Sequence, residues 1–458
     1  MAEINLRNIE LFDGERFTGK RDLRISGSAV YDVASPGLID RGPTADLDLT
    51  GMWALPAMCD LHAHLREPGG EHKETVASGL AAAARGGFGA VVSMPNTDPP
   101  CDSPDMVQVL RELRLTAQAV SSLDRPLPAL YPAAALTKGR AGREPVDFEA
   151  LLQAGCHVFT DDGSDVADDE VLRRVMQAVA AARAPEGVLP RVMFHAQDAE
   201  LMGGGVMHQG EVSRRLGLPG IPRESEDRAV ARAIRFGLEY RVPVHVTHLT
   251  TAGAVELLRT GKRQFAQAGL KGFLTCDVTP HHLTFTDADC ERLGALAKVN
   301  PPLREPADRA ALRDALLDGT IDAVATDHAP HTAEEKALPF AEAPFGIAGL
   351  EVALAAAFTA LGSPPVGPVA ERLLGALTLA PARILRQDTY PGTLRERNMA
   401  DLAVFDPHAE WEVRPEAFAS KCKASPYAGM KLKGRVMLTI LGGDITYSAL
   451  PGLVINGR

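Results

Sequence analysis

Residues 60–67 read DLHAHLRE and follow an apolar run, and residues 326–331 read TDHAPH after another. His62 and His64 are two residues apart, and side chains two apart on a strand point to the same face. Two imidazoles on one face at the end of a strand can share a metal ion. Asp327 ends the second run, IDAVATD, where a carboxylate can reach the same site. The two segments therefore predict a metal site built from strand ends.

Short apolar runs alternate with amphipathic stretches along most of the chain. In the amphipathic stretches apolar residues recur at three- and four-residue spacing, which is typical of helices, so the alternation predicts a parallel sheet. Eight such units over this length fit a (β/α)8 barrel of the TIM type, whose catalytic residues sit at the C-terminal ends of the strands. The runs are 53–62, 89–96, 127–136, 156–162, 190–197, 242–249, 272–281 and 322–330, and the clearest helical stretches are 73–87, 104–120, 169–184, 226–241 and 308–319.

The two ends of the chain differ from its middle. Residues 1–52 and 398–447 alternate in polarity and turn often, so we expect both ends to form one small β domain beside the barrel. The predicted division is 1–54 and 391–458 for the β domain and 55–390 for the catalytic barrel. Residues 332–344 are polar, contain proline and follow the last barrel strand, so they are a candidate for a mobile loop over the site.

Composition excludes several classes of function. The chain has 458 residues, 45% hydrophobic and 23% charged, which is globular composition. A net charge of −11 argues against nucleic-acid binding. No long apolar run or signal sequence is present, so we expect a cytoplasmic protein without a membrane partner. The six cysteines form no CxxC pair, and we expect free, mostly buried thiols.

Further candidate ligands end other runs. His195 ends VMFH and His248 ends VHVTH. Each taken alone is better read as a hydrogen-bonded core histidine. Four histidines and two aspartates at strand ends are harder to explain by packing, since buried charged groups are costly unless paired or metal-bound. Zinc suits imidazole and carboxylate ligands without cysteine, and two ions about 3.5–4 Å apart would use all six.

Two metal ions need a bridging group. A carboxylated lysine is one such group, but GCHVFTDDGSD at 155–165 contains no lysine. Asp161 and Asp162 are the alternatives, and only one of two adjacent strand residues can point inward. The other would then serve as a turn or helix-cap residue.

Polar residues near these positions are candidates for substrate contact. Arg66 lies two residues after His64, and a guanidinium beside a metal can hold a carboxylate in a bidentate fork; a surface arginine is the alternative. Asn96 and Asn300 each lie near prolines, so structural turns are the alternative for them. His331 can bind an anion if protonated or donate a neutral hydrogen bond. We regard His281 and His282 as supporting or structural.

Several motifs together resemble one family. DLHAHLREPGGEHKET, MPNTDPP, FTDDG, VTPHHL, NPPLR, ATDHAPHTAEEK and APFG follow in order from about residue 55 to 350. They resemble the dihydroorotases of the amidohydrolase superfamily, in their class I bacterial form. The resemblance implies a metal-dependent barrel with a small β domain. It also implies the reversible cyclisation of N-carbamoyl-L-aspartate to L-dihydroorotate in pyrimidine (UMP) biosynthesis.

The resemblance implies roles for individual residues. His62, His64 and Asp327 are similar to the ligands of one zinc ion, His195 and His248 to those of a second, and Asp162 to the bridging carboxylate. Asp327 would also transfer the proton in catalysis. Contacts to the substrate are implied for Arg66, Asn96 and His331 at its α-carboxylate, and for Asn300 and the backbone of Phe345 and Gly346 at the rest of the ring, with His64 beside them.

The resemblance leaves several points open. One or two Zn²⁺ per subunit would fit. It also leaves open whether the chain forms a homo-oligomer or associates with aspartate carbamoyltransferase. A hydantoinase or allantoinase is the alternative enzyme, although those relatives typically carry the bridging lysine. A non-catalytic scaffold is less consistent with the sequence, because no candidate ligand is missing.

Overall fold

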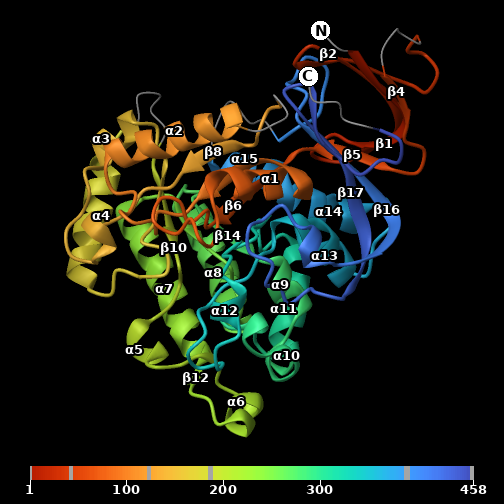
Figure 1. Cartoon of the computed structure of the whole chain (residues 1–458). Coiled ribbons are helices and arrows are strands. Elements are labelled where there is room, and N and C mark those ends of the chain that lie inside the picture. Colours follow the sequence, from red (N-terminus) through yellow and green to blue (C-terminus); the bar gives the residue numbers. More distant parts are fainter. Residues whose placement is uncertain (1–2, 41–44, 121–124, 184–188, 386–391, 454–458) are drawn as a thin grey trace.

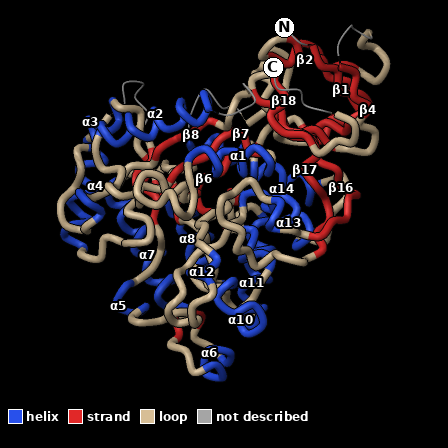
Figure 2. The backbone as a smooth tube through the Cα atoms, in the orientation of Figure 1, coloured by secondary structure: helices blue, strands red, loops and turns tan. Residues whose placement is uncertain are grey.

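Parallel strands enclosed by helices form the larger part of the molecule (Figure 2). The computed structural model describes residues 3–40, 45–120, 125–183, 189–385 and 392–453. One parallel sheet contains β6 (Met58–Ala63), β7 (Phe88–Ser93) and β8 (Ala129–Pro132). A second contains β9 (Val158–Phe159), β10 (Arg191–Phe194), β13 (Val244–Val246), β14 (Leu274–Val278) and β15 (Ala323–Val324).

Two single bridges join these sheets into a ring. Ala134 pairs with Phe159 in parallel, and Ala63 pairs in parallel with His328, so β8 meets β9 and β6 meets the end of β15. The result is a closed barrel of eight parallel strands, as predicted, with one barrel strand in each predicted run.

The structure differs from the prediction in the first run, 53–62. The run breaks at Ala57, so that β5 (Trp53–Pro56) belongs to a different sheet and only β6 joins the barrel. The prediction of a single strand over 53–62 is therefore wrong. Every residue of both strands is buried, and a continuous buried run carries no alternation that would reveal the change of sheet.

The helices surround the barrel where the amphipathic stretches predict them. Helix α1 begins at Thr75, whose side chain forms a capping box with Ser78, and it ends at Gly87, which has a φ of 89°. The other long helices are α2 (Pro104–Val120), α4 (Asp169–Ala181), α7 (Arg223–Tyr240), α8 (Ala252–Gln267) and α11 (Pro306–Asp318), and α1 spans Val76–Gly86.

Shorter elements fill the connections. The helices are α3 (Phe148–Gln153), α5 (Ala199–Met202), α6 (Glu211–Leu216), α9 (Pro280–Thr284), α10 (Asp287–Leu293), α12 (Ala333–Lys336), α13 (Ala353–Ala360), α14 (Pro368–Leu377) and α15 (Leu379–Leu385). The 3₁₀ turns are Lys138–Arg140, Gly294–Ala297, Leu350–Val352 and Pro415–Ala417, and the short strands are β11 (Met207–His208) and β12 (Gly220–Ile221).

Strands from both ends of the chain form one further sheet (Figure 1, red and blue strands). Its order is β18-β17-β16-β5-β1-β2-β3, with β4 paired to β1. The ends meet where β16 runs antiparallel to β5. The strands are β1 (Glu3–Phe12), β2 (Phe17–Ser26), β3 (Ala29–Ala34), β4 (Ala45–Asp48), β16 (Leu402–Glu412), β17 (Lys431–Leu441) and β18 (Asp444–Ser448).

The division into 1–54, 55–390 and 391–458 stays a prediction. Its first boundary falls inside β5, and its second falls within residues 386–391, which lie outside the described residues.

An aromatic cluster joins this sheet to the barrel. Trp53 of β5 makes edge contacts with Phe17, at 5.0 Å between ring centroids, and with Phe358 of α13, at 5.7 Å. Phe358 also meets Phe405 of β16 at 5.2 Å. Edge-to-face aromatic pairs add to the free energy of burial itself, so the cluster fixes the sheet against the barrel.

We expect Phe358→Ala to lower the free energy of unfolding by about 3–5 kcal/mol, because it removes a buried ring and leaves a cavity between the two parts. Chemical denaturation followed by circular dichroism measures this. Tyr31, which is 67% exposed, gives the control, and Tyr31→Ala should change stability by less than about 0.5 kcal/mol. Equal stabilities of the two variants would show that the cluster does not join the parts.

Candidate active site

The C-terminal ends of the barrel strands bring the six predicted metal ligands together. His62 lies on β6 and His64 just beyond it, Asp162 follows β9, His195 follows β10, His248 follows β13, and Asp327 follows β15. All six side chains are buried. Parallel strands expose their carboxyl ends at one mouth of a barrel, and this explains how residues far apart in sequence meet.

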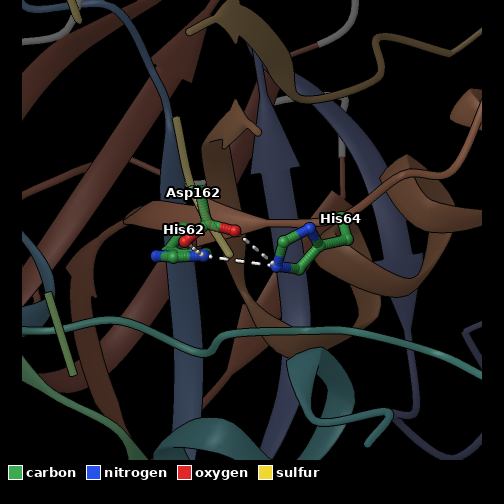
Figure 3. Close-up of side chains that lie close together, drawn as sticks. All are labelled: His62, His64 and Asp162. Atoms are coloured by element: carbon green, nitrogen blue, oxygen red, sulfur yellow. Dashed lines mark hydrogen bonds and ion pairs between the residues drawn. The ribbon is translucent and has the colours of Figure 1, made fainter. Parts of the chain in front are cut away.

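The first group of ligand atoms centres on the two histidines of the HxH pair (Figure 3). Their Nε2 atoms are 3.3 Å apart. Asp162 reaches both, with Oδ1 3.2 Å from His62 Nε2 and Oδ2 3.5 Å from His64 Nε2. Asp327 Oδ1 lies 3.2 Å from His64 Nε2 and 3.6 Å from His62 Nε2. Five nitrogen and oxygen atoms from four residues thus lie close together.

Asp162 also belongs to a second group. One ligand atom each from Asp162, His195 and His248 lie within 4.8 Å of one another, and so do those of His62, His64 and Asp162. Asp162 is therefore shared, as a bridging carboxylate between two cations would be.

The residues present fit a bound cation. Among the described residues, His62 Nδ1, Asp162 Oδ1 and His248 Nδ1 are buried atoms without a hydrogen-bond partner. A native fold rarely leaves so many polar atoms of one site unsatisfied, and a bound cation would pair with them. The donors are nitrogen and oxygen atoms, which suits a divalent metal of the zinc type.

Electrostatics supports the same reading. Burial opposes a charge on His62, but Asp162 and Asp327 outweigh it and raise the pKa of His62 to about 10. Burial also opposes ionisation of Asp327, yet the hydrogen bond to His64 and the nearby His62 and His248 hold the pKa of Asp327 well below its usual range. The carboxylates of Asp162 and Asp327 therefore remain ionised and attract a cation to the space between them.

Neighbouring residues orient the ligands. His64 Nδ1 lies 2.9 Å from Asn96 Oδ1 and donates to it, which leaves the His64 Nε2 lone pair for a metal. Asp277 Oδ1 accepts from the backbone N–H of His248 at 2.6 Å. Its other oxygen lies 2.8 Å from His245 Nε2. The charged residue within the apolar run LTCDV is the sequence signal for this support.

The side chains of Asp161 and Asp162 point to different sides of the chain, as predicted for adjacent residues. Asp161 Oδ1 accepts from the backbone N–H groups of Leu136 and Thr137, at 2.8 and 3.1 Å. Its Oδ2 accepts from the Thr137 hydroxyl at 2.5 Å. Asp161 thus faces away from the ligand cluster and ties β8 to β9.

Three site residues have left-handed backbone conformations. The φ angles are 62° for Arg66, 39° for His248 and 46° for Asp327. Such conformations are uncommon outside glycine and concentrate at functional sites, where the surrounding contacts hold them. Strand periodicity contains no signal for them.

The ligand cluster opens into a cavity of about 370 Å³. Its volume is at the lower end of the range for small-molecule sites. All the predicted substrate residues line it, namely His64, Arg66, Asn96, Asn300, His331, Phe345 and Gly346. The wall of the cavity therefore combines the carboxylates of Asp162 and Asp327 with the basic side chains of Arg66 and His331.

The sequence alone did not identify several residues around this cavity. Gln197 and Asn300 join their side-chain amides reciprocally, at 2.8 and 2.9 Å. Glu335 and Lys73 flank His331. Gln197 lies two residues after His195, so the same-face rule could have found it, whereas nothing in the local pattern around Lys73 or Glu335 of α12 indicates a contact with His331.

Several proteins similar in sequence to this chain are named dihydroorotase. The family model described as Dihydro-orotase-like matches residues 51–254. A dihydroorotase of Desulforapulum autotrophicum is 38% identical over 447 residues, which cover 97% of this chain and 99% of that protein. One of Anaeromyxobacter dehalogenans strain 2CP-C is 43% identical over 433 residues, 94% of each chain. The chain belongs to the dihydroorotase family.

Solved structures agree on the fold. The L-hydantoinase of Arthrobacter aurescens superposes with a TM-score of 0.80 at 21% identity, covering 99% of this chain and 98% of its own. Dihydropyrimidinase from Brevibacillus agri NCHU1002 gives 0.77 at 19% identity, covering 97% and 94%. These similarities confirm the barrel with its β domain. The family confirms the predicted class of enzyme, a hydrolase acting on cyclic amides.

The adjacent aspartates give a matched test of the metal centre. We expect Asp162→Asn to lower the content of bound divalent metal, because it removes the carboxylate that both ligand groups share. Asp161→Asn should keep the metal but lower the melting temperature, since it weakens three buried hydrogen bonds. Elemental analysis after dialysis and a thermal melt measure the two effects. Full metal content in Asp162→Asn would contradict the bridging role.

Proposed function

We propose that the chain catalyses the reversible cyclisation of N-carbamoyl-L-aspartate to L-dihydroorotate in pyrimidine biosynthesis. The observation that carries the proposal is the cavity itself, which is lined both by members of the ligand cluster and by Arg66 and His331. The substrate needs both groups of residues. Its amide reacts at the ligand cluster, and its carboxylate is held by Arg66 and His331. The names of the sequence relatives support this reaction.

Zinc is the metal we propose, with one or two ions per subunit. His62, His64 and Asp327 would hold one, His195 and His248 the other, and Asp162 would bridge them. When bound, the metal polarises the reacting carbonyl and lowers the pKa of a bound water to about 7.

Asp327 is the catalytic residue in this proposal. Its pKa, held low by His62 and His64, keeps it ionised and able to accept a proton. In the synthetic direction its carboxylate would remove the proton from the ureido nitrogen. In the hydrolytic direction it would first accept the proton of the attacking water and then deliver it to the leaving ring nitrogen, as general acid–base catalysis requires.

The rest of the cavity would orient the substrate. Arg66 and His331 would bind the α-carboxylate, together with the amide N–H of Asn96, whose oxygen already accepts from His64. Asn300 and the backbone of Phe345 and Gly346 would contact the ring. Gly346 has a φ of 126°, and a Cβ there would lie 2.5 Å from the Ala329 carbonyl oxygen, so the wall at this point requires glycine.

The hydantoinase alternative is less well supported. The structural similarities that favour it have 19–21% identity, which shows the fold alone. The bridging position holds Asp162 rather than the lysine of those enzymes, and the Arg66–His331 end would have no carboxylate to bind in unsubstituted hydantoin.

Further predictions concern the cellular location and the partners of the enzyme. Among the described residues no helix is long and apolar enough to cross a membrane. We propose a cytoplasmic location, in line with six free, buried cysteines. The substrate is a small molecule. Homo-oligomerisation and association with aspartate carbamoyltransferase stay predictions.

Metal removal and return test the proposed function. Chelator treatment should abolish hydrolysis of L-dihydroorotate, and zinc titration should restore it, with the stoichiometry giving the number of ions. Hydantoin is the control substrate, because its five-membered cyclic ureide lacks the carboxylate. Zinc uptake with turnover of hydantoin and none of dihydroorotate would favour the alternative.

Replacement of the proposed proton-transfer group gives a second test. Asp327→Asn should lower kcat by about 10²–10⁴-fold while retaining some metal, because an amide cannot accept the proton. Asp322→Asn is the control. Asp322 lies just before β15, at the opposite end of this strand from Asp327, and forms an ion pair with Lys262. Steady-state kinetics with metal analysis decides, and near-native turnover by Asp327→Asn would refute the assignment.

A further inference from the structure

The carboxylate-binding end of the cavity contains a chain of four charged or titratable side chains. Arg66 Nη2 lies 3.2 Å from His331 Nε2. His331 Nδ1 lies 3.0 Å from Glu335 Oε2, and Glu335 Oε1 lies 2.8 Å from Lys73 Nζ. Lys73 Nζ is also 3.4 Å from His331 Nδ1. Glu335 and Lys73 have no role in the function proposed above.

These contacts fix the hydrogen on the His331 ring. A guanidinium can only donate, so His331 Nε2 accepts from Arg66 and carries no hydrogen. The hydrogen of the neutral ring then lies on Nδ1, where it is donated to the Glu335 carboxylate. Glu335 is held in place by the ion pair with Lys73 and by the backbone N–H of Thr332, at 3.1 Å.

With the hydrogen on Nδ1, His331 Nε2 cannot donate a hydrogen bond to a carboxylate. A carboxylate accepts hydrogen bonds and cannot donate, so it needs a hydrogen on His331 Nε2. Glu335 keeps the hydrogen on Nδ1. The ring can therefore contact the substrate carboxylate through Nε2 only by taking up one proton from solvent and becoming an imidazolium ion between two carboxylates.

We propose that Glu335 is a positioning residue that retains the Nδ1 hydrogen of His331, so that binding of the substrate carboxylate is coupled to uptake of one proton. This inference rests on the proposed function, which supplies the carboxylate. The ring nitrogen gains the proton and no covalent bond in the ligand changes.

The charges around His331 set the direction of the pH dependence. Burial, Arg66 and Lys73 lower the pKa of free His331 to about 3, while Glu335 opposes them. A bound carboxylate raises this pKa, because it offsets Arg66. Proton uptake therefore weakens binding as pH rises, by up to tenfold per pH unit between the free and bound pKa values.

Calorimetry on the zinc-loaded protein tests the coupling. Orotate, a pyrimidine ring with the carboxylate, is titrated at pH 7.5 in two buffers of different ionisation enthalpy, and uracil, the same ring without it, is the control ligand. We expect proton uptake for orotate that grows towards one proton when the titration is repeated at lower pH, and none for uracil. Binding of orotate without uptake, or no tighter than uracil, would overturn the inference.

Two variants separate positioning from folding. Glu335→Gln should weaken orotate binding about tenfold and abolish the uptake, because the charged partner of the imidazolium is lost. Glu334→Gln, an exposed neighbour on α12, should change neither. Lys73→Met should retain the uptake, since Glu335 remains.

The outcomes also distinguish the two proposals. If orotate binds without uptake and Lys73→Met loses binding, the ring has moved its hydrogen to Nε2 with Lys73 donating to Nδ1, and the inference is wrong. A zinc-loaded chain that does not hydrolyse L-dihydroorotate would instead refute the proposed function. An active chain without proton uptake would refute this inference alone.

Discussion

Closure of the barrel between its first and last strands is the constraint on which the site depends. Asp60 accepts from both the backbone N–H and the hydroxyl of Thr326, at 2.8 and 2.6 Å. The backbone N–H of His64 donates to the carbonyl of His328 at 2.7 Å. These bonds place His64 beside Asp327, 263 residues away, so the ligand set exists only when the ring is closed.

The sheet formed by the chain ends also contributes to this closure. Glu74 is fully buried, and its carboxylate lies 3.2 Å from His328 Nε2. The same carboxylate accepts from the Ser420 hydroxyl at 2.5 Å and the Lys421 backbone N–H at 3.0 Å. The residue after Asp327 is thereby tied to the segment between β16 and β17. The β domain therefore stabilises the last barrel strand behind the site, in addition to packing on the helices.

The sequence predicted those features that follow from repetition. Strand ends recur in a barrel, so His195 and His248 could be placed at the same mouth as the HxH pair without any contact information. The same rule predicted that only one of Asp161 and Asp162 faces inward, but not which one without the resemblance. Features that depend on long-range contacts were missed. The reciprocal amide pair of Gln197 with Asn300 is an example, since it joins segments 103 residues apart.

Arg66 would form an ion pair with Asp162 or Asp327 if no other contact held its guanidinium away from them. Asp327 and Asp162 attract the guanidinium of Arg66, whose pKa burial nevertheless lowers. Arg66 is instead held by the Pro330 carbonyl oxygen at 3.3 Å and by His331. A guanidinium that moved to the aspartates would occupy the place of a cation. By accepting from Arg66, His331 helps to hold the guanidinium away from Asp162 and Asp327, and the support of its ring by Glu335 therefore matters to the ligand cluster as well.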